Sequence, residues 1–202
     1  MQNKYKIIVF DAFGTLVKIG QSRSPYRKLM KWLREEGRKP STQDAYIIMS
    51  NSVDIAELAK IFGKVIPTPL LGEISDDLDF ELKTIELYED TVSILKKLKN
   101  RGFKIAICSN LAMPYGERLK ELFPDIYDAL VFSYEIQAIK PDRKIYESIQ
   151  QEFGCQMSDI LFIGDNPLLD VETPIRLGMC SRLCERGKMQ GLDDILVDLL
   201  KN

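Results

Sequence analysis

The stretch Tyr-Lys-Ile-Ile-Val-Phe-Asp-Ala-Phe-Gly-Thr-Leu, residues 5–16, decides the fold. Its first six residues are mostly apolar, as in a short strand that is buried on both faces. Asp11 follows this run directly, and the carboxyl end of a parallel strand is where doubly wound folds bind their ligands. Gly14 lets a ligand approach the backbone closely, and the N–H groups of a turn such as this one, which runs on into Thr15, can surround an anion. An isolated Asp-x-x-Gly-Thr run also fits an ordinary turn, so its meaning depends on the rest of the chain.

Further short apolar runs follow, separated by helix-length amphipathic stretches. These runs cover residues 103–108, 130–133, 160–163 and 179–183. Residues 91–100 and 143–153 have a helical pattern and are followed by Gly102 and Gly154, and glycine commonly ends a helix. Strands that alternate with helices form parallel β-α-β units. We therefore predict an α/β fold with a three-layer, doubly wound parallel sheet.

Residues 17–88 interrupt this alternation. They contain helix-like patterns, one of which places Leu29 and Leu33 on an apolar face, but no apolar run that is typical of a buried strand. We predict that the segment is a small helical cap, inserted after the first strand of an α/β core that comprises residues 1–16 and 89–202. Aromatic side chains of this cap could either line a substrate pocket or pack its helices together, namely Tyr26, Trp32 and Phe80.

The composition excludes several classes of function. The 202 residues include 28 basic and 30 acidic side chains, a balance that argues against a nucleic-acid or an anionic-membrane partner. There is no histidine, which excludes Ser-His-Asp and Cys-His catalysis and every histidine-ligated metal site. The four cysteines form no Cys-x-x-Cys pair, no stretch resembles a signal peptide, and no apolar run approaches membrane-spanning length. We therefore expect a cytoplasmic protein that acts on a small molecule.

Polar side chains also follow the other predicted strands of the core. In chain order they are Ser109, Asn110, Lys140, Asp165 and Asp170. Taken singly, each has an ordinary structural explanation. Lys140 could be a solvated surface lysine, and Asp170 a favourable acid in the first turn of a helix that Asn166 caps and Pro167 begins. Their common place at the strand ends favours a shared site instead.

In this order and spacing, Asp11, Ser109, Lys140 and the pair Asp165 and Asp170 resemble the four sequence motifs of the haloacid dehalogenase superfamily. The predicted cap is similar to the C1-type cap of that superfamily. The resemblance implies that Asp11 is a covalent nucleophile, that Ser109 hydrogen-bonds the transferring group, and that Lys140 neutralises charge on the nucleophile and the substrate. It also implies a set of residues that bind the substrate, namely Gly14, Thr15, Ser109, Asn110 and Lys140.

The resemblance further implies a Mg²⁺ cofactor. The ion would be held by the Asp165 and Asp11 side chains and by the backbone carbonyl of Phe13, and Asp170 would steady the metal site directly or through water. Elementary chemistry agrees, because Mg²⁺ prefers oxygen ligands from one or two carboxylates together with substrate phosphate. A carboxylate nucleophile opposite a phosphate dianion also needs a cation between the two.

Phe13 is the residue at which the chain departs from the superfamily's phosphatases. Those enzymes have a second aspartate there, which is their general acid–base. Its loss removes the proton donor for an alkoxide leaving group and the base that activates water, and such catalysis typically contributes about 10²–10⁴-fold. The leading interpretation is therefore slow, Mg²⁺-dependent hydrolysis of a small phosphate ester through an aspartyl-phosphate at Asp11.

Two other functions remain open. The superfamily's 2-haloacid dehalogenases carry an aromatic residue where this chain has Phe13, and they need no proton donor because a halide leaves unprotonated. They work without metal, however, and lack the glycine-aspartate pair that Gly164 and Asp165 form here. They also need a cationic clamp for the substrate carboxylate, for which Arg23 and Arg27 are candidates. The third interpretation is a non-catalytic module that binds phosphate or a metabolite.

Overall fold

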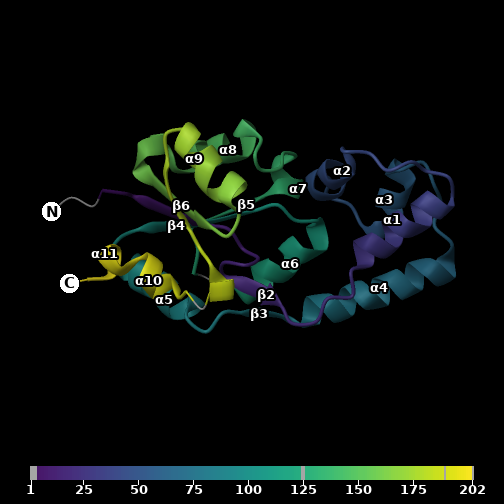
Figure 1. Cartoon of the computed structure of the whole chain (residues 1–202), viewed down its shortest axis with the longest axis horizontal. Helices are drawn as coiled ribbons and strands as arrows, with labels where there is room; N and C mark the ends of the chain where they lie inside the picture. Colours follow the sequence, from purple (N-terminus) through teal and green to yellow (C-terminus); the bar gives the residue numbers. More distant parts are fainter. Residues whose placement is uncertain (1–3, 124–125, 189, 202) are drawn as a thin grey trace.

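The computed structural model of the chain describes residues 4–123, 126–188 and 190–201. At its centre is a parallel sheet of five strands in the order β5-β4-β1-β6-β7 (Figure 1). The strands are β1 (Ile7–Phe10), β4 (Lys104–Ser109), β5 (Ala129–Phe132), β6 (Ile160–Gly164) and β7 (Cys180–Leu183). All five coincide with the predicted strands to within two residues, and the predicted doubly wound fold is confirmed.

The two faces of the sheet are buried under different helices, which gives the core its three layers. Ile8 and Phe10 of β1 point into one apolar cluster, and Ile7 and Val9 point into the other, because side chains alternate along a strand. The first cluster is closed by α5 (Thr91–Asn100), α6 (Met113–Leu122) and α10 (Leu192–Ile195). The second is closed chiefly by α8 (Arg143–Phe153). Figure 1 shows α8 and α5 on opposite sides of the sheet.

The two helices predicted most clearly, α5 and α8, have the predicted bounds. The Asp142 side chain caps α8 by accepting a hydrogen bond from the Lys144 N–H, and Gly154 ends the helix at a φ of 57°. β7 differs from the prediction, because its residues are only half-buried rather than buried on both faces. It is the last strand at one edge of the sheet, where neighbours cover it less completely.

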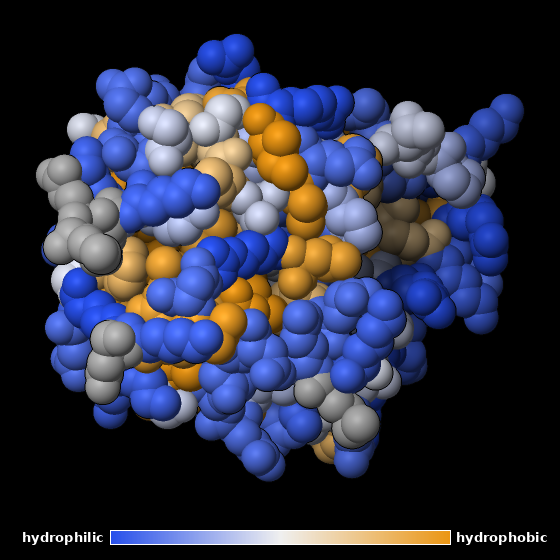
Figure 2. Space-filling model, turned by 60° about the vertical axis from the view of Figure 1, so that its left-hand side comes forward, coloured by the Kyte–Doolittle hydropathy of each residue, from blue (hydrophilic) through white to orange (hydrophobic). Residues whose placement is uncertain are grey.

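Short elements complete the core. They are α7 (Ser133–Ile136), η1 (Met157–Asp159), η2 (Pro167–Glu172), α9 (Thr173–Arg176), η3 (Arg186–Lys188) and α11 (Val197–Leu200). Figure 2 shows the end of the molecule near the two termini, where hydrophilic side chains cover most of the face and apolar atoms reach it only in a limited band. Within the described ranges, no helix is both long and apolar enough to cross a membrane.

Between β1 and α5 the chain leaves the core and forms four helices. They are α1 (Pro25–Glu35), α2 (Asp44–Ser50), α3 (Ile55–Ile61) and α4 (Thr68–Lys83), which share an apolar cluster of their own. Figure 1 shows them side by side at the end of the molecule away from the termini. We keep the name cap for residues 17–88, which contain these helices.

The cap is helical except at its two ends, where two short, partly exposed strands occur. β2 (Val17–Ile19) and β3 (Ile85–Leu87) pair antiparallel, with Val17 opposite Leu87. The last helix of the cap ends at Lys83, because the chain turns back there into the core beside β2. These strands are only three residues long, too short to give a periodic sequence signal.

Candidate active site

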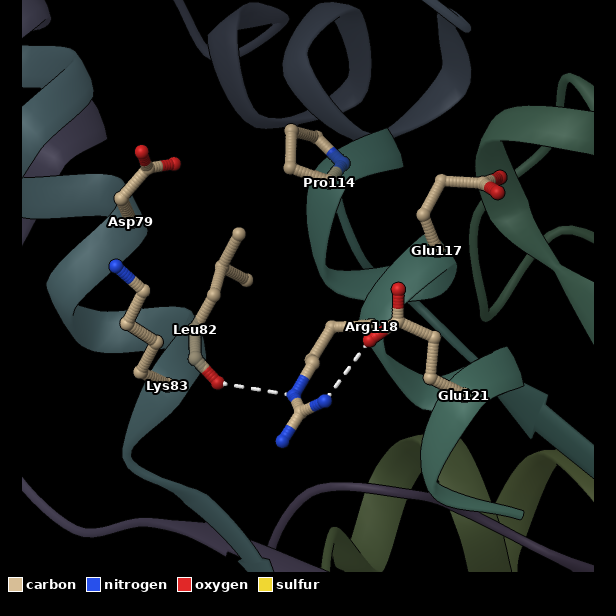
Figure 3. A pocket seen from close by; sticks show the side chains of 7 residues that line it. All are labelled: Asp79, Leu82, Lys83, Pro114, Glu117, Arg118 and Glu121. Atoms are coloured by element: carbon tan, nitrogen blue, oxygen red, sulfur yellow. Dashed lines mark hydrogen bonds and ion pairs between the residues drawn. The ribbon is translucent and has the colours of Figure 1, made fainter. Parts of the chain in front are cut away.

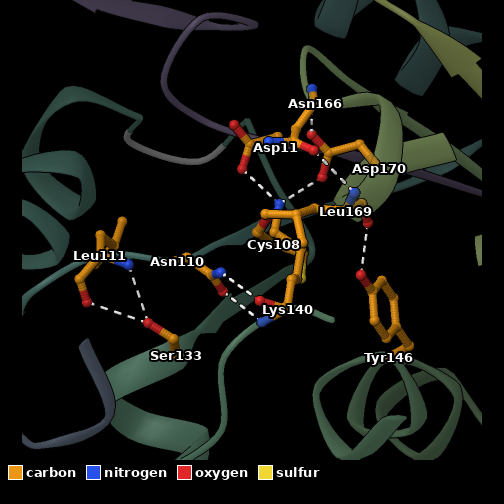
Figure 4. Close-up of polar contacts among 10 residues, drawn as sticks. All are labelled: Asp11, Cys108, Asn110, Leu111, Ser133, Lys140, Tyr146, Asn166, Leu169 and Asp170. Carbon is orange, nitrogen blue, oxygen red and sulfur yellow. Dashed lines mark hydrogen bonds and ion pairs between the residues drawn. The ribbon is translucent and has the colours of Figure 1, made fainter. Parts of the chain in front are cut away.

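The predicted site residues gather at the carboxyl ends of three neighbouring strands. Asp11 follows β1, Ser109 ends β4 and Asp165 follows β6, and β1 lies between the other two strands. Lys140 follows α7, and Asp170 lies in η2 (Figure 4). Residues far apart in the sequence therefore meet at one edge of the sheet, as the topology of a doubly wound fold requires.

Lys140 holds the centre of this group. Its ammonium nitrogen Nζ lies 2.7 Å from Asp11 Oδ1 and 2.7 Å from Asp170 Oδ1, and 3.2 Å from the Cys108 carbonyl oxygen (Figure 4). Lys140 is 3% exposed and Asp170 is 1% exposed, so this ion pair is shielded from water. The interpretation of Lys140 as a solvated surface lysine is therefore wrong.

The charges of this buried group act on one another. Burial disfavours the Lys140 ammonium, but the Asp11 and Asp170 carboxylates outweigh it and raise the pKa of Lys140 above its usual range. Burial raises the pKa of Asp11 to about 6; the positive charge of Lys140 opposes this shift and the negative charge of Asp170 adds to it. One ammonium thus serves two carboxylates.

The turn after β6 places Asp170 against the sheet. The Asn166 side chain accepts hydrogen bonds from the N–H groups of Leu168 and Leu169, which confirms the expected N-cap, and Asp170 Oδ2 accepts a hydrogen bond of 3.0 Å from the Asn166 N–H. Gly164 makes this approach possible. A Cβ atom on Gly164 would lie 2.3 Å from Asp170 Oδ2, so any larger residue would displace the carboxylate.

Asp11, Asp165 and Asp170 form a compact group, the carboxylate cluster, in which one oxygen from each lies within 4.8 Å of the others. Asp165 is exposed as a residue, but its carboxylate is partly desolvated. This desolvation is the main cause that raises the pKa of Asp165, and repulsion from Asp170 is the second. Three carboxylates and the single Lys140 ammonium leave a net charge of minus two. Hard oxygen ligands with two uncompensated charges fit a divalent cation such as Mg²⁺.

The loop after β1 lies directly against this cluster. Gly14 has a φ of 77°, and a Cβ atom there would lie 2.2 Å from Asp165 Oδ2, so this position needs glycine for two reasons. Thr15 is fully buried, and its hydroxyl has no hydrogen-bond partner among the described residues. Contacts from Gly14 and Thr15 to a substrate remain predictions.

Ser109 and Asn110 are placed differently from one another. Ser109 is 2% exposed at the end of β4. The Asn110 carboxamide instead binds the backbone of Lys140, since its Oδ1 accepts from the Lys140 N–H at 2.7 Å and its Nδ2 donates to the Lys140 carbonyl at 2.9 Å (Figure 4). Asn110 therefore orients Lys140, a role that the sequence did not suggest.

An apolar hollow of about 260 Å³ opens where the cap meets the loops that carry Phe13 and Asn110. Its wall contains three aromatic rings. Phe13 meets Tyr115 edge-on at a centroid distance of 5.9 Å, and Tyr26 lies 6.1 Å from Tyr115. The described residues that line it are Phe13, Ile19, Tyr26, Ile48, Met49, Asn110, Leu111, Ala112 and Tyr115.

Of the cap aromatics considered from the sequence, only Tyr26 is among these lining residues. Trp32 packs against the apolar cluster of the cap, and the Phe80 ring lies 3.5 Å from the Arg23 guanidinium carbon. Arg23 also pairs with Asp77, and Arg27 lines a separate hollow on the cap. Neither arginine is among the described residues of the apolar hollow.

The cap is tied to the core on both sides of this hollow. On one side, the Ser133 hydroxyl of the core donates to the Met49 carbonyl oxygen at 2.6 Å. On the other, Tyr115 of α6 donates its hydroxyl to Glu81 of α4 at 2.7 Å. Beyond Glu81, the cap and the core enclose a charged hollow between α4 and α6, where Arg118 bridges Leu82 and Glu121 (Figure 3).

Arg186 is a further residue of the site that sequence reasoning missed. Its guanidinium donates to the Thr15 carbonyl oxygen at 3.0 and 2.8 Å, and it pairs with both oxygens of Asp90 at 2.8 and 2.9 Å. It thereby fixes the loop that follows the nucleophile to the start of α5. The signal is absent from the sequence because the three segments are joined only by the fold.

Comparisons with known proteins agree with this geometry. Curated relatives include the glyceraldehyde 3-phosphate phosphatase of Methanopyrus kandleri, 29% identical over 117 residues that cover 57% of this chain and half of the relative. The enolase-phosphatase E1 of Aquifex aeolicus is 28% identical over 191 residues, 80% of this chain and 82% of that protein. An (S)-2-haloacid dehalogenase of Pseudomonas sp. strain YL is 32% identical over 81 residues, 39% of this chain and 35% of the relative.

Solved structures share the fold at low sequence identity. A haloacid dehalogenase-family enzyme of Bacteroides thetaiotaomicron is 16% identical, with a TM-score of 0.69 over 96% of this chain and 99% of that one. The sequence model of the haloacid dehalogenase-like hydrolase family matches residues 5–178 of this chain, which include Asp11, Ser109 and Asp165 at the strand ends. The chain is a member of the haloacid dehalogenase-like hydrolase family.

Proposed function

We propose that this hydrolase cleaves small phosphate esters with the help of Mg²⁺, and that Asp11 is the nucleophile that accepts the phosphoryl group. The observation that carries the proposal is the carboxylate cluster, which has a net charge of minus two together with Lys140. A dianionic phosphate cannot approach such a site without a divalent cation. Mg²⁺ would be held by Asp11 and Asp165, by the carbonyl of Phe13, and by Asp170 directly or through water.

The residues of the chain supply the nucleophile and its surroundings. A free oxygen of the Asp11 carboxylate attacks phosphorus, the new O–P bond forms, and the bond from phosphorus to the leaving-group oxygen breaks. Lys140 compensates charge on Asp11 and on the phosphoryl oxygens, and the Ser109 hydroxyl and the N–H groups after Asp11 donate to those oxygens. Water then attacks the same phosphorus, releasing phosphate and the free carboxylate. Bound Mg²⁺ would neutralise negative charge during both steps.

Other features support this proposal over a dehalogenase. The solved enzyme of Bacteroides thetaiotaomicron has been crystallised with magnesium and inorganic phosphate. A haloacid would have to bring its own carboxylate to the negative cluster, and neither Arg23 nor Arg27 reaches the apolar hollow as a clamp.

Hydrolysis of 2-haloacids through an aspartyl ester at Asp11 is the second candidate. It is favoured by one observation, the aromatic Phe13 two residues after the nucleophile, in the wall of the apolar hollow. A module that only binds phosphate is the third candidate. All three make different predictions about turnover and about the need for metal.

A substrate screen with the purified protein separates these candidates. p-Nitrophenyl phosphate and 2-chloropropionate are each tested with MgCl₂ and with EDTA, and Asp11→Asn is the control. We expect phosphate release that requires Mg²⁺ and Asp11. Chloride release that persists in EDTA would favour the dehalogenase, and the absence of both products would favour the binding module.

A further inference from the structure

The apolar hollow beside the carboxylate cluster has a composition that selects among phosphate esters. Phe13 comes two residues after Asp11, and Asn110 comes one residue after Ser109, so the hollow begins at the loops that carry the nucleophile and the hydroxyl. Ile48 and Met49 of the cap are among its other lining residues. The organic part of a phosphate ester bound at Asp11 would therefore lie in this hollow.

No charged residue is found among the described residues that line the hollow. A carboxylate or a second phosphate on the substrate would lose its hydration there without gaining a partner, which is strongly unfavourable. An apolar group would instead gain contacts with the rings of Phe13, Tyr26 and Tyr115. The volume of about 260 Å³ suits one ring with small substituents, since an apolar cavity of about 150 Å³ holds benzene.

The same walls contain no side chain placed to protonate a leaving group. Phe13 has no exchangeable proton. The Tyr115 hydroxyl donates a hydrogen bond to Glu81, so its proton is already engaged. The Tyr26 hydroxyl is fully buried, without a hydrogen-bond partner among the described residues, so it does not open onto the hollow. The carboxamide of Asn110 binds the Lys140 backbone. The alcohol of the substrate must therefore leave as a stable anion without help.

Phenols meet both requirements. A phenol has a pKa of about 10, as tyrosine does, whereas an alkanol is about as weak an acid as water, whose pKa is about 15.7. We propose that the substrates are phosphate monoesters of uncharged phenols, with the ring in the apolar hollow and the phosphoryl group at Asp11. This inference rests on the proposed function and adds the class of leaving group to it.

The test compares substrates that differ in one property each. Phenyl phosphate has an apolar ring and a good leaving group. Benzyl phosphate has an apolar ring but a poor leaving group, and 4-carboxyphenyl phosphate has a charged ring. Acetyl phosphate has a good leaving group but no ring, and it reports phosphoryl transfer at Asp11 independently of the hollow. Steady-state kinetics are measured for all four with Mg²⁺, and with Asp11→Asn as the control.

We expect benzyl phosphate to have a kcat/KM at least about 100-fold below that of phenyl phosphate, because kcat/KM reports the first chemical step, in which the alcohol leaves without a proton donor. We expect 4-carboxyphenyl phosphate to have a kcat/KM at least about tenfold below that of phenyl phosphate. Met49→Lys should lower the ratio of kcat/KM for phenyl phosphate to that for acetyl phosphate by at least tenfold. Val65→Lys, at an exposed position of the cap outside the hollow, should leave this ratio unchanged.

The outcomes separate the inference from the function on which it rests. If acetyl phosphate is hydrolysed with Mg²⁺ and Asp11 but benzyl or 4-carboxyphenyl phosphate matches phenyl phosphate in kcat/KM, the inference is overturned and the proposed function stands. An unchanged substrate ratio in Met49→Lys would likewise overturn the inference. If none of the four compounds is hydrolysed, both are overturned together.

Discussion

Replacing Asp165 by asparagine preserves the size of the side chain and removes one of the three negative charges in the carboxylate cluster. The oxygens of Asp165, Asp11 and Asp170 lie within 4.8 Å of one another, so each pair of charges repels. At that separation Coulomb's law gives about 3.5 kcal/mol for an effective dielectric constant of 20 and about 0.9 kcal/mol for bulk water. Because Asp165 is exposed, the lower figure is the better guide.

This repulsion sets opposite expectations with and without metal. In EDTA, Asp165→Asn should be at least as stable as the wild type, since the substitution relieves repulsion. With Mg²⁺ at a hundredfold excess over its Kd, the wild type should gain about 2.7 kcal/mol of unfolding free energy. For a chain of this length, that corresponds to a rise in Tm of about 5–11 °C. The variant, which lacks one of the proposed carboxylate ligands, should lose most of this rise.

The assay is thermal unfolding in EDTA and across a MgCl₂ series. Asp76→Asn is the matched control, because Asp76 is an exposed acid on α4 that lies outside the cluster. It should respond to Mg²⁺ as the wild type does. If Mg²⁺ raises the Tm of Asp165→Asn as much as that of the wild type, the proposed metal site is wrong.

Three further substitutions test other parts of the account. Lys140→Met leaves the Asp11 and Asp170 carboxylates buried without a counter-charge, so urea unfolding in EDTA should show a free energy of unfolding about 3–5 kcal/mol lower than that of the wild type. A decrease of less than about 1 kcal/mol would show that the two ion pairs contribute little to stability. Burial raises the pKa of Glu81, but hydrogen bonds from Tyr115 and from the backbone N–H groups after Ser22 outweigh it and leave the pKa below its usual value. The contribution of ionised Glu81 to stability should therefore be complete above about pH 4.5 and disappear at lower pH. Glu81→Gln should lower the free energy of unfolding by about 1.5–3 kcal/mol at pH 7 and leave it unchanged near pH 2. A difference in Tm between wild type and variant that is independent of pH would contradict this. Phe13→Asp should raise kcat/KM for benzyl phosphate more than for phenyl phosphate, since it supplies the acid that the poorer leaving group needs. Equal effects on both esters would refute that role for the position.

The sequence predicted the sheet well because its strands carry strong local signals. The runs that became β1, β4 and β6 are continuous and apolar, and burial on both faces of a parallel sheet demands such runs. The helices α5 and α8 have apolar periodicity, and glycine follows each of them. β2 and β3 escaped prediction because each is three residues long and is stabilised by pairing with the other, and their first residues, Val17 and Ile85, are 68 positions apart in the sequence.

The site was predictable only as far as topology brings strand ends together. Asp11, Ser109 and Asp165 lie together because the parallel strands β1, β4 and β6 end side by side, which can be expected without knowledge of any contact. Lys140 and Asp170 reach Asp11 from the segment after α7 and from η2. The role of Asn110, by contrast, depends on where a loop after α7 passes, and that of Arg186 on the approach of a segment near the C-terminus. Such contacts are set by packing between distant segments and have no local pattern in the sequence.

The apolar hollow illustrates the same limit. Phe13 is conspicuous in the sequence because it replaces an expected aspartate, yet nothing local predicts that Tyr115 packs edge-on against it. Tyr26 could have lined a pocket or packed within the cap, and only the docking of the cap decides between the two. The chemical meaning of Phe13 therefore becomes specific only when its neighbours are known.

The central claim is that Asp11 accepts a phosphoryl group and that Phe13 makes its release slow. Rapid-quench kinetics with p-nitrophenyl phosphate and Mg²⁺, combined with intact-mass measurement of the quenched protein, tests it most directly. We predict a burst of p-nitrophenolate followed by slow turnover, with one phosphoryl group on the wild-type chain and none on Asp11→Asn. The absence of a phosphoenzyme in the wild type, together with chloride release from 2-chloropropionate, would contradict the account in favour of a dehalogenase.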